Sequence, residues 1–404
     1  MLAGVQKKCV SVLFLLIFSV LSVCAQSPAA RFAMSDAVRS DKCAVVIVDL
    51  KTGKEIDSHN AKKPLIPASV TKAVTIATTL AESGINYKYH TRVYMTGPVE
   101  DGELKGNLLI EGGGDPSLGA NVEPRGSDFI FEITQVLKKY GVKCIAGKII
   151  VDASVFPGPP VPSHWVSGDL KHAYGTGCHG FNWQRNASGK QAVQNPSSVF
   201  ISQLTSALKR EGITIADGAY SDDKKGRPVL DHSSPPIDEI MRSCMKRSDN
   251  LYAEAFLRTY AMLKDRPAET KEGAGLEMDY WKHRGADMEY VWIVDGSGLS
   301  RYNQLTARFL ADVLVKMARN ADYASFFPLA GQEGTLSSFL KGTRLEGYIA
   351  MKTGSMSGVQ CYAGYMLDDD YAPTHVVVIM INDFKGARAN VKKAAETMLL
   401  ETFK

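Results

Sequence analysis

The hydrophobic residues of the chain fall into short runs, and the lengths of these runs predict the secondary structure. Residues 43–50 (CAVVIVDL) are rich in Val and Ile and predict a buried strand. The run from Val70 to Glu82 has neither Gly nor Pro and few charges, so its length favours a buried helix ending at Gly84. Towards the C-terminus, three strands and a closing helix are predicted at residues 348–352, 360–366, 374–382 and 389–402.

The pattern of hydrophobic residues changes near residue 85, where the middle part of the chain begins. Short apolar stretches at residues 91–95 and 104–111 predict strands. Residues 156–195 are rich in Gly, Pro, Asn and His, which is typical of long loops. Three further helices are predicted, at residues 196–212, 237–263 and 305–319.

The order of these elements predicts the domain organisation. Strands near both ends of the chain, with helices beside them, indicate one α/β (α+β) domain whose sheet uses both ends. We expect residues 26–84 and 236–404 to form this domain, and residues 85–235 to form a large inserted domain. A length of 404 residues is sufficient for two such domains.

The segment formed by residues 1–25 has the pattern of a secretory signal peptide. Lys7 and Lys8 precede an uncharged apolar run that ends at Val23, and small residues favour cleavage after Ala25. The run is short for a bilayer span, so we expect export to the periplasm with no stable membrane span after cleavage. An uncleaved anchor and a lipidated Cys24 are the alternatives.

Composition excludes several classes of protein. With 45% hydrophobic residues the chain is globular, and its net charge of +4 is too small to indicate a nucleic-acid binder. Five cysteines follow residue 25, at irregular spacings that form no disulfide framework: Cys43, Cys144, Cys178, Cys244 and Cys361. No nucleotide or other cofactor is expected for an exported protein of this kind.

Candidate chemistry begins with Ser69 and Lys72, at the start of the predicted buried helix. A spacing of three places both side chains on one face, where a lysine can take the proton of a serine hydroxyl if burial lowers its pKa. The same pattern recurs at Ser206/Lys209, Ser221/Lys224, Ser243/Lys246 and Ser338/Lys341. Those four pairs lie in charged or turn-like stretches, so predicted burial favours Ser69 and Lys72.

Two further patterns are each ambiguous when taken alone. Ser248-Asp249-Asn250 could relay protons and orient an amide, but Ser and Asp are also favoured helix caps. Lys352-Thr353-Gly354 follows an apolar strand and could bind an extended peptide that ends in a carboxylate, or could be a surface turn.

Together, in the order Ser69, Ser248 and Lys352, these patterns resemble the motifs S-x-x-K, S-x-N and K-T-G of the active-site serine penicillin-recognising enzymes. The long interval between the first two is unlike class A β-lactamases. The chain is similar to the D-alanyl-D-alanine carboxypeptidase/endopeptidase family, the low-molecular-weight class C (type-4) penicillin-binding proteins. Three more stretches support this resemblance, which covers nearly the whole mature chain: residues 113–118, 295–301 and 330–336.

The resemblance implies a penicillin-recognising, serine transpeptidase-like domain with an antiparallel sheet flanked by helices. It also implies acyl transfer, in which Ser69 attacks the carbonyl of the penultimate D-alanine and Lys72 is the general base. Ser248 and Asn250 would relay the proton to the departing amine and hold the substrate backbone. The backbone N–H groups of Ser69 and Ser355 would form the oxyanion hole.

The resemblance assigns substrate-binding roles as well. Lys352 and Thr353 would bind the terminal carboxylate, and the charge of Lys352 would help keep Lys72 deprotonated. Gly354 leaves room for close backbone approach. Asp169 lies where the family has an acid that contacts the amine of the peptide stem. Larger members carry a second β-rich subdomain for which this chain has almost no residues, so one inserted domain is expected.

Rival interpretations have less support. Residues 175–180 have the glycine pattern of a dinucleotide-binding motif, but no apolar strand precedes them. The cluster of His164, His172, Cys178 and His179 fits no standard metal spacing, so no metal is expected. The expected partners are peptidoglycan stem peptides, with β-lactam antibiotics as covalent inhibitors. A β-lactamase and a weakly active peptidoglycan-binding module are the alternatives.

Overall fold

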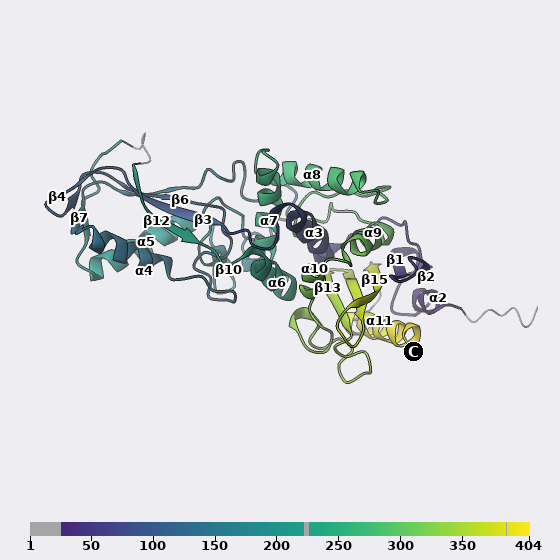
Figure 1. Ribbon diagram of the computed structural model, residues 1–404. Coiled ribbons are helices and arrows are strands. Elements are labelled where there is room, and N and C mark those ends of the chain that lie inside the picture. Colours follow the sequence, from purple (N-terminus) through teal and green to yellow (C-terminus); the bar gives the residue numbers. More distant parts are fainter. Residues whose placement is uncertain (1–25, 222–225, 385) are drawn as a thin grey trace, which may run out of the picture.

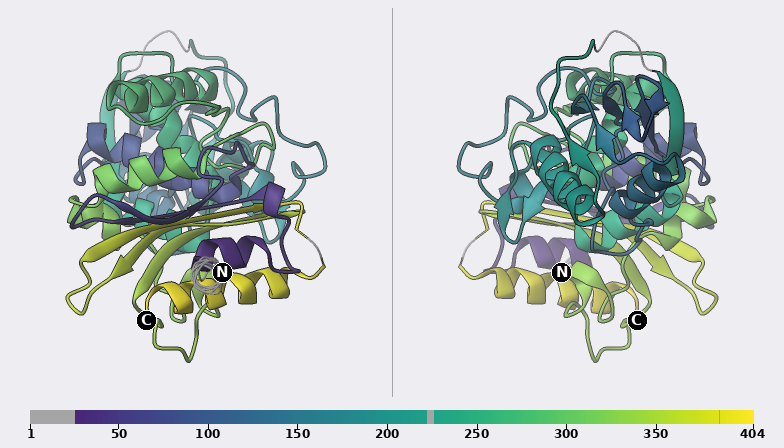
Figure 2. Two further views of the ribbon diagram at one scale, coloured as in Figure 1. Left: turned by 90° about the vertical axis from the view of Figure 1, so that its right-hand side faces the viewer. Right: turned by 90° about the vertical axis from the view of Figure 1, so that its left-hand side faces the viewer.

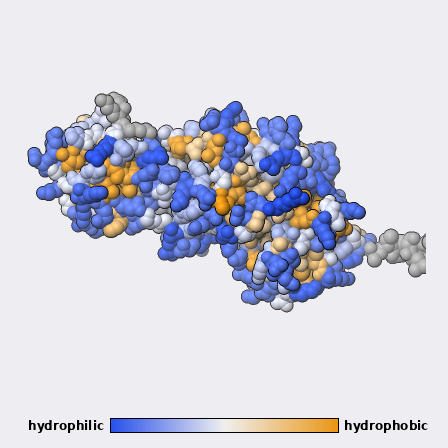
Figure 3. All heavy atoms as spheres, in the orientation of Figure 1, coloured by the Kyte–Doolittle hydropathy of each residue, from blue (hydrophilic) through white to orange (hydrophobic). Residues whose placement is uncertain are grey.

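The computed structural model describes residues 26–221, 226–384 and 386–404, so the expected signal peptide lies outside the described residues. Figure 1 shows an elongated molecule with a large sheet at one end and smaller sheets at the other. The face seen in Figure 3 is mainly hydrophilic, with small hydrophobic patches. None of the described helices has the length and apolar character needed to cross a membrane.

The large sheet has five antiparallel strands in the order β13-β14-β15-β1-β2. Their bounds are β1 (Cys43–Asp49), β2 (Glu55–His59), β13 (Ile349–Met356), β14 (Val359–Leu367) and β15 (Pro373–Asn382). β1 pairs with β15 from Cys43, opposite Ile381, to Asp49, opposite His375. Both ends of the chain therefore share one sheet, which confirms the predicted fold class, and β13 is an edge strand.

Helices cover both faces of this sheet, as Figure 2 shows. One face carries α2 (Pro28–Ala33) and α11 (Arg388–Thr402). On the other face lie α3 (Thr71–Ser83), α7 (Asn250–Leu263), α8 (Thr270–His283), α9 (Ala307–Met317) and α10 (Ala321–Ser325). The alternation of strand side chains explains the two cores, because Val45 and Ile47 enter one core and Val46 and Val48 enter the other.

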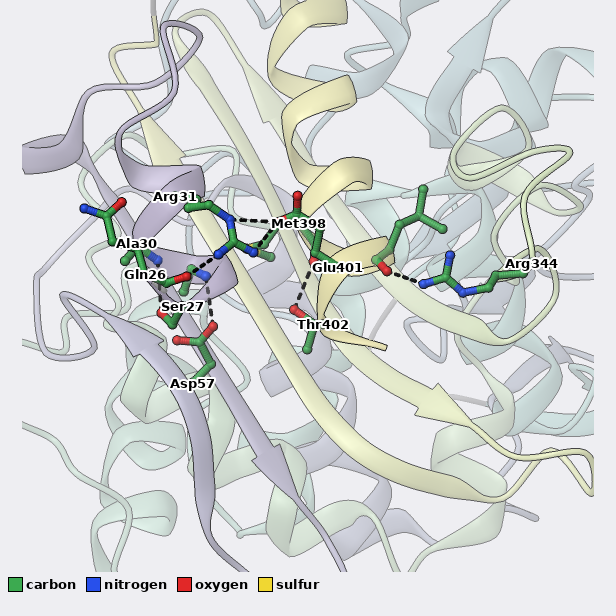
Figure 4. Close-up of polar contacts among 11 residues, drawn as sticks. Gln26, Ser27, Ala30, Arg31, Asp57, Arg344, Met398, Glu401 and Thr402 are labelled. Atoms are coloured by element: carbon green, nitrogen blue, oxygen red, sulfur yellow. Dashed lines mark hydrogen bonds and ion pairs between the residues drawn. The ribbon is translucent and has the colours of Figure 1, made fainter. Parts of the chain in front are cut away.

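Polar contacts fasten α2 to α11 (Figure 4). Arg31 Nη2 on α2 lies 2.7 Å from Glu401 Oε2 on α11. The Ser27 side chain caps α2 by accepting a hydrogen bond from the N–H of Ala30, and the N–H of Ala29 donates to Asp57 on β2. α2 is thereby held against both the sheet and α11.

Residues 90–233 contain two smaller four-stranded sheets, ordered β12-β3-β6-β8 and β11-β7-β5-β4. Their bounds are β3 (His90–Met95), β4 (Val99–Glu100), β5 (Glu103–Leu104), β6 (Leu108–Glu111), β7 (Cys144–Ile145), β8 (Ile149–Asp152), β11 (Thr214–Ile215) and β12 (Arg227–Ser233). A short hairpin joins β9 (Ala187–Ser188) to β10 (Gln191–Ala192). Helices α4 (Phe129–Lys139) and α5 (Pro196–Arg210) share one hydrophobic core with these sheets.

The helix predicted over residues 237–263 is wrong in one respect, because it is two helices, α6 (Ile237–Arg247) and α7. Ser248 adopts the left-handed conformation, with φ 60° and ψ 43°, and ends α6. Asp249 then begins α7, because its side chain accepts a hydrogen bond from the N–H of Tyr252. The apolar periodicity continues through both helices and does not report this break.

The central sheet gives a direct stability prediction. Ile379 on β15 has 0% of its surface exposed, so Ile379→Ala should lower the free energy of unfolding by about 2–5 kcal/mol. The matched control is Ile56→Ala on β2, where the side chain is 50% exposed and the expected change is under about 0.5 kcal/mol. Urea denaturation measures both, and equal losses in the two variants would contradict this packing.

Candidate active site

Ser69 and Lys72 lie where a short 3₁₀ turn, η2 (Ala68–Val70), runs into α3. Lys72 is fully buried, and its Nζ is 3.0 Å from Ser69 Oγ. The same Nζ donates to Asn250 Oδ1 and to the carbonyl oxygen of Ser297, each at 2.6 Å. The side chains of Ser69 and Lys72 therefore lie on the same side at the beginning of α3, as their spacing predicts.

Ser248 and Asn250 flank the break between α6 and α7. The left-handed backbone at Ser248 allows its Oγ to accept a hydrogen bond from Lys352 Nζ at 2.9 Å. Asn250 donates through Nδ2 to the carbonyl oxygen of Tyr174 at 2.7 Å. This second bond orients the amide so that its oxygen faces Lys72.

The K-T-G motif lies inside β13 rather than after it, on the edge strand of the sheet. Lys352 is fully buried, and Thr353 donates through Oγ1 to Thr335 Oγ1 at 2.7 Å. A Cβ atom on Gly354 would lie 2.5 Å from the carbonyl oxygen of Pro67 and 3.1 Å from the nitrogen of Ser69. Glycine is therefore required for the edge strand to pack this closely against η2.

The structure brings seven of the eight residues given a chemical role by the resemblance into one site. They are Ser69, Lys72, Ser248, Asn250, Lys352, Thr353 and Ser355. A cleft of about 470 Å³ opens over them. The eighth, Asp169, is not among the described residues that line this cleft; the Tyr174 hydroxyl donates to its Oδ1 at 2.9 Å.

Burial lowers the pKa of both lysines. For Lys72, loss of hydration outweighs the opposing effect of Cys244, Asp295 and other neighbours, so its pKa lies below the ordinary value. Burial moves the pKa of Lys352 well below its ordinary value, and the charge of Lys72 lowers it further. Because repulsion between two ammonium groups is mutual, protonation of either one disfavours protonation of the other.

Two buried acids hold the segment that contacts Lys72. Glu254 Oε1 accepts a hydrogen bond from the N–H of Ser297 at 2.8 Å, and Asp295 Oδ1 accepts one from the N–H of Gly298 at 2.8 Å. The carbonyl group of Ser297 between them is thereby aimed at Lys72. Burial raises the pKa of Glu254 to about 7, and its Oε2 has no hydrogen-bond partner within the described chain.

Several of these contacts cannot be predicted from the sequence. Ser297 and Thr335 lie in the stretches 295–301 and 330–336, which the sequence marks only through the family resemblance. A main-chain carbonyl such as that of Ser297 has no sequence signature. Tyr174 was missed for the same reason, because its carbonyl oxygen is the acceptor for Asn250.

The loops around the site show no sign of metal or disulfide chemistry in the part of the chain described. In these ranges no three His, Cys, Asp or Glu residues are grouped as metal ligands. All five cysteines of the described chain are free thiols. Burial lowers the pKa of His179 to about 4, so this histidine is neutral near pH 7.

Comparison with solved structures identifies the fold. The protein matches penicillin binding protein 4 (dacB) from Haemophilus influenzae with a TM-score of 0.80 and 21% identity, over 93% of this chain and 99% of that one. A second structure of that protein, complexed with a β-lactam, matches with a TM-score of 0.71 and 21% identity, over 92% of this chain and 98% of that one. The fold is therefore the penicillin-recognising fold with an inserted domain.

The profile of the D-Ala-D-Ala carboxypeptidase 3 (S13) family matches residues 27–191 and 184–402, so the chain belongs to this family. It is 28% identical over 345 residues to carboxypeptidase DacB of Mycolicibacterium smegmatis, covering 80% of this chain and 72% of that one. It is 24% identical over 386 residues to D-alanyl-D-alanine carboxypeptidase DacB of Haemophilus influenzae, covering 77% of this chain and 79% of that one. The protein is a serine-type D-Ala-D-Ala carboxypeptidase, which confirms the predicted enzyme class.

The close approach of β13 to η2 predicts a sensitive position. Gly354→Ala should lower kcat/KM for a D-Ala-D-Ala peptide on the order of 10²-fold, because the new Cβ pushes the strand away from Ser69. Gly275→Ala on α8 is the matched control, since a Cβ there meets no heavy atom within 4 Å. Steady-state kinetics measure both, and parental activity in Gly354→Ala would contradict the packing described.

Buried Glu277 on α8 predicts how stability depends on pH. Burial raises its pKa from 4.5 to about 8, so stability is fully present below pH 4.5 and falls as the pH rises towards 8. The expected loss is on the order of a few kcal/mol. Glu277→Gln, compared by urea denaturation at pH 5 and pH 8, should flatten this dependence, whereas Glu123→Gln at an exposed position should not. An unchanged slope in Glu277→Gln would refute the assignment.

Proposed function

We propose that the enzyme cleaves peptidoglycan stem peptides through an acyl-enzyme on Ser69. One observation carries this proposal: Ser69 Oγ lines the cleft and lies 3.0 Å from the Nζ of a fully buried lysine, Lys72. A nucleophile beside a desolvated base is the arrangement that serine acyl transfer requires. The β-lactam held by the Haemophilus influenzae protein of the same fold supports the same chemistry here.

Lys72 acts in this proposal as the general base. A neutral amine has two N–H donors and one lone pair. Asn250 Oδ1 and the carbonyl oxygen of Ser297 accept the two donors, so the lone pair faces Ser69. The Ser69 hydroxyl gives its proton to Lys72 as its oxygen bonds to the carbonyl carbon of the penultimate D-alanine.

Lys352 and Ser248 complete the first step. As the C–N bond breaks, the departing amine takes a proton from the Ser248 hydroxyl, and Lys352 gives one proton back to Ser248. The proton that Lys72 took from Ser69 passes to Lys352, so one proton moves in total from Ser69 to the amine. The backbone N–H groups of Ser69 and Ser355 stabilise the oxyanion, and the contact of Gly354 with η2 keeps the two N–H groups near each other.

Thr353 and Ser355, with the amino group of Lys352, bind the terminal carboxylate of the substrate. Both hydroxyl groups line the cleft, and β13 offers an edge along which an extended peptide can lie. Asp169 is retained as a contact for the stem amine, because Tyr174 connects it to Asn250. In the second step, water attacks the acyl carbonyl and frees Ser69.

The geometry favours a penicillin-binding carboxypeptidase over a β-lactamase. Fast release of a penicilloyl group requires a group that activates water, and no acid lines the described part of the cleft. We extend the proposal to the cleavage of peptide cross-links, since the cleft continues past Ser355 to α11.

The proposal also includes the location of the enzyme and its division into two domains. We assign residues 1–25 to a signal peptide and place the mature enzyme in the periplasm, where its substrate lies. Residues 26–84 and 236–404 form the catalytic domain, and residues 85–235 form the inserted domain. The separate hydrophobic core of the inserted segment supports this division.

Labelled penicillin tests the proposal. The parent enzyme should form a covalent adduct that is lost in Ser69→Ala, because the adduct requires the Ser69 oxygen. Ser206→Ala, at another S-x-x-K sequence, should keep the adduct, since the Ser206 hydroxyl on α5 donates to the carbonyl oxygen of Ser202 in its own helix. Gel fluorescence and intact mass measure the adduct.

Two outcomes would contradict this account. An adduct that persists in Ser69→Ala, or no adduct in the parent, would refute the nucleophile. An adduct that decays within seconds would favour the β-lactamase instead, because it would show efficient deacylation.

A further inference from the structure

The cleft above Ser69 extends beyond the groups that the proposed reaction uses. Its lining includes Ser69, Thr353 and Ser355, and it also includes Arg388 and Lys392 from the first two turns of α11. Among the described residues that line the cleft there are two cations and no carboxyl group. Such a lining concentrates positive potential and attracts anions.

Arg388 is held in place by neutral groups. Its Nη1 donates to the carbonyl oxygen of Val359 at 2.8 Å and to Gln360 Oε1 at 2.6 Å, and its Nη2 donates to the carbonyl oxygen of Met356 at 2.8 Å. Within the described ranges no carboxylate forms an ion pair with this guanidinium group. Its charge is therefore fixed in position and available to an anion in the cleft.

Gln360 connects Arg388 to the proposed carboxylate site. Only 4% of Gln360 is exposed, and its Oε1 accepts hydrogen bonds from both Ser355 Oγ, at 2.7 Å, and Arg388 Nη1, at 2.6 Å. Ser355 and Arg388 thus bind the same oxygen atom. An anionic group held by Arg388 would lie within one side-chain length of a carboxylate held at Ser355.

Lys392 lies one helical turn beyond Arg388 on the same wall of the cleft. Its Nζ donates to the carbonyl oxygen and to Oγ of Ser338, and Glu396 Oε1 is 3.8 Å away. Basic residues in the first turns of a helix oppose its dipole, and α11 has no acid in its first turn. Local helix stability therefore does not explain the presence of Arg388, whereas Lys392 also forms an i,i+4 ion pair with Glu396.

We propose that Arg388, assisted by Lys392, binds a second carboxylate on the leaving segment of the substrate. The inference rests on the proposed function, in which Lys352, Thr353 and Ser355 hold the first carboxylate. A single D-alanine carries only that first carboxylate and leaves Arg388 unused. The subsite selects peptides whose residue after the scissile bond bears an additional acid, as in an acidic cross-linked peptide.

Two synthetic peptides test this selectivity. Both carry the acyl segment Nα,Nε-diacetyl-Lys-D-Ala, and they differ only in the leaving residue, which is D-Glu or D-Gln. These leaving residues have nearly the same shape, so only the second carboxylate distinguishes them. The enzyme should show about a fivefold higher kcat/KM for D-Glu at low salt, and the ratio should fall as salt screens the charge.

Variants then locate the source of the preference. Arg388→Gln should reduce the D-Glu to D-Gln ratio to about one, and Arg388→Lys should keep an intermediate ratio because it retains the charge. The matched control is Lys393→Gln, at the neighbouring exposed lysine, which lines a different groove between α2 and α11. This control should leave the ratio unchanged. Thermal unfolding of each variant verifies that it is folded.

Equal kcat/KM for the two peptides in the parent would overturn the subsite, as would a preference that survives Arg388→Gln. The subsite would also be overturned if Arg388→Lys and Arg388→Gln had the same ratio of kcat/KM for the D-Glu and D-Gln peptides. Penicillin labelling separates this inference from the proposed function. A labelled parent without a D-Glu preference refutes the subsite alone, whereas an unlabelled parent refutes both.

Discussion

The burial of two lysine side chains, Lys72 beside Ser69 and Lys352 beside Ser248, is the constraint on which the rest of the structure depends. Removing an ammonium group from water is unfavourable unless acceptors surround it. Here the acceptors come from separate elements: Asn250 from α7, Ser297 from the loop before α9, and Ser248 from the break before α7. The helices and the edge strand must therefore pack in the correct positions, because otherwise the buried amino groups of Lys72 and Lys352 would lack hydrogen-bond acceptors.

The topology explains how such distant residues converge. Because β1 and β15 pair in the centre of the sheet, both ends of the chain are closed into one layer. The edge strand β13 then packs against η2, where Gly354 permits close backbone approach. The inserted segment also reaches the site, through the carbonyl oxygen of Tyr174 and through Trp165 Nε1, which donates to Asp295 Oδ2 at 2.9 Å.

The residues that carry charge or a nucleophile could be predicted from sequence, because their types and order are specific to the chemistry. Among the S-x-x-K lysines that the structure describes, Lys72 is fully buried, whereas Lys209, Lys246 and Lys341 are at least partly exposed. The break at Ser248 could not be predicted, since the apolar period of α6 continues into α7. Main-chain acceptors such as the carbonyl of Ser297 leave no mark in sequence. Arg388 was missed because an arginine on a terminal helix is ordinary until the fold places it in the cleft.

The central claim is that burial keeps the two lysines from holding their protons as ordinary lysines do. The most direct measurement is an NMR titration of ¹³C-labelled lysine side chains, with Lys72 and Lys352 assigned by substitution. The account predicts that both titrate below the ordinary value of 10.5 and that each shifts when the other is removed. Two independent titrations near 10.5 would contradict it.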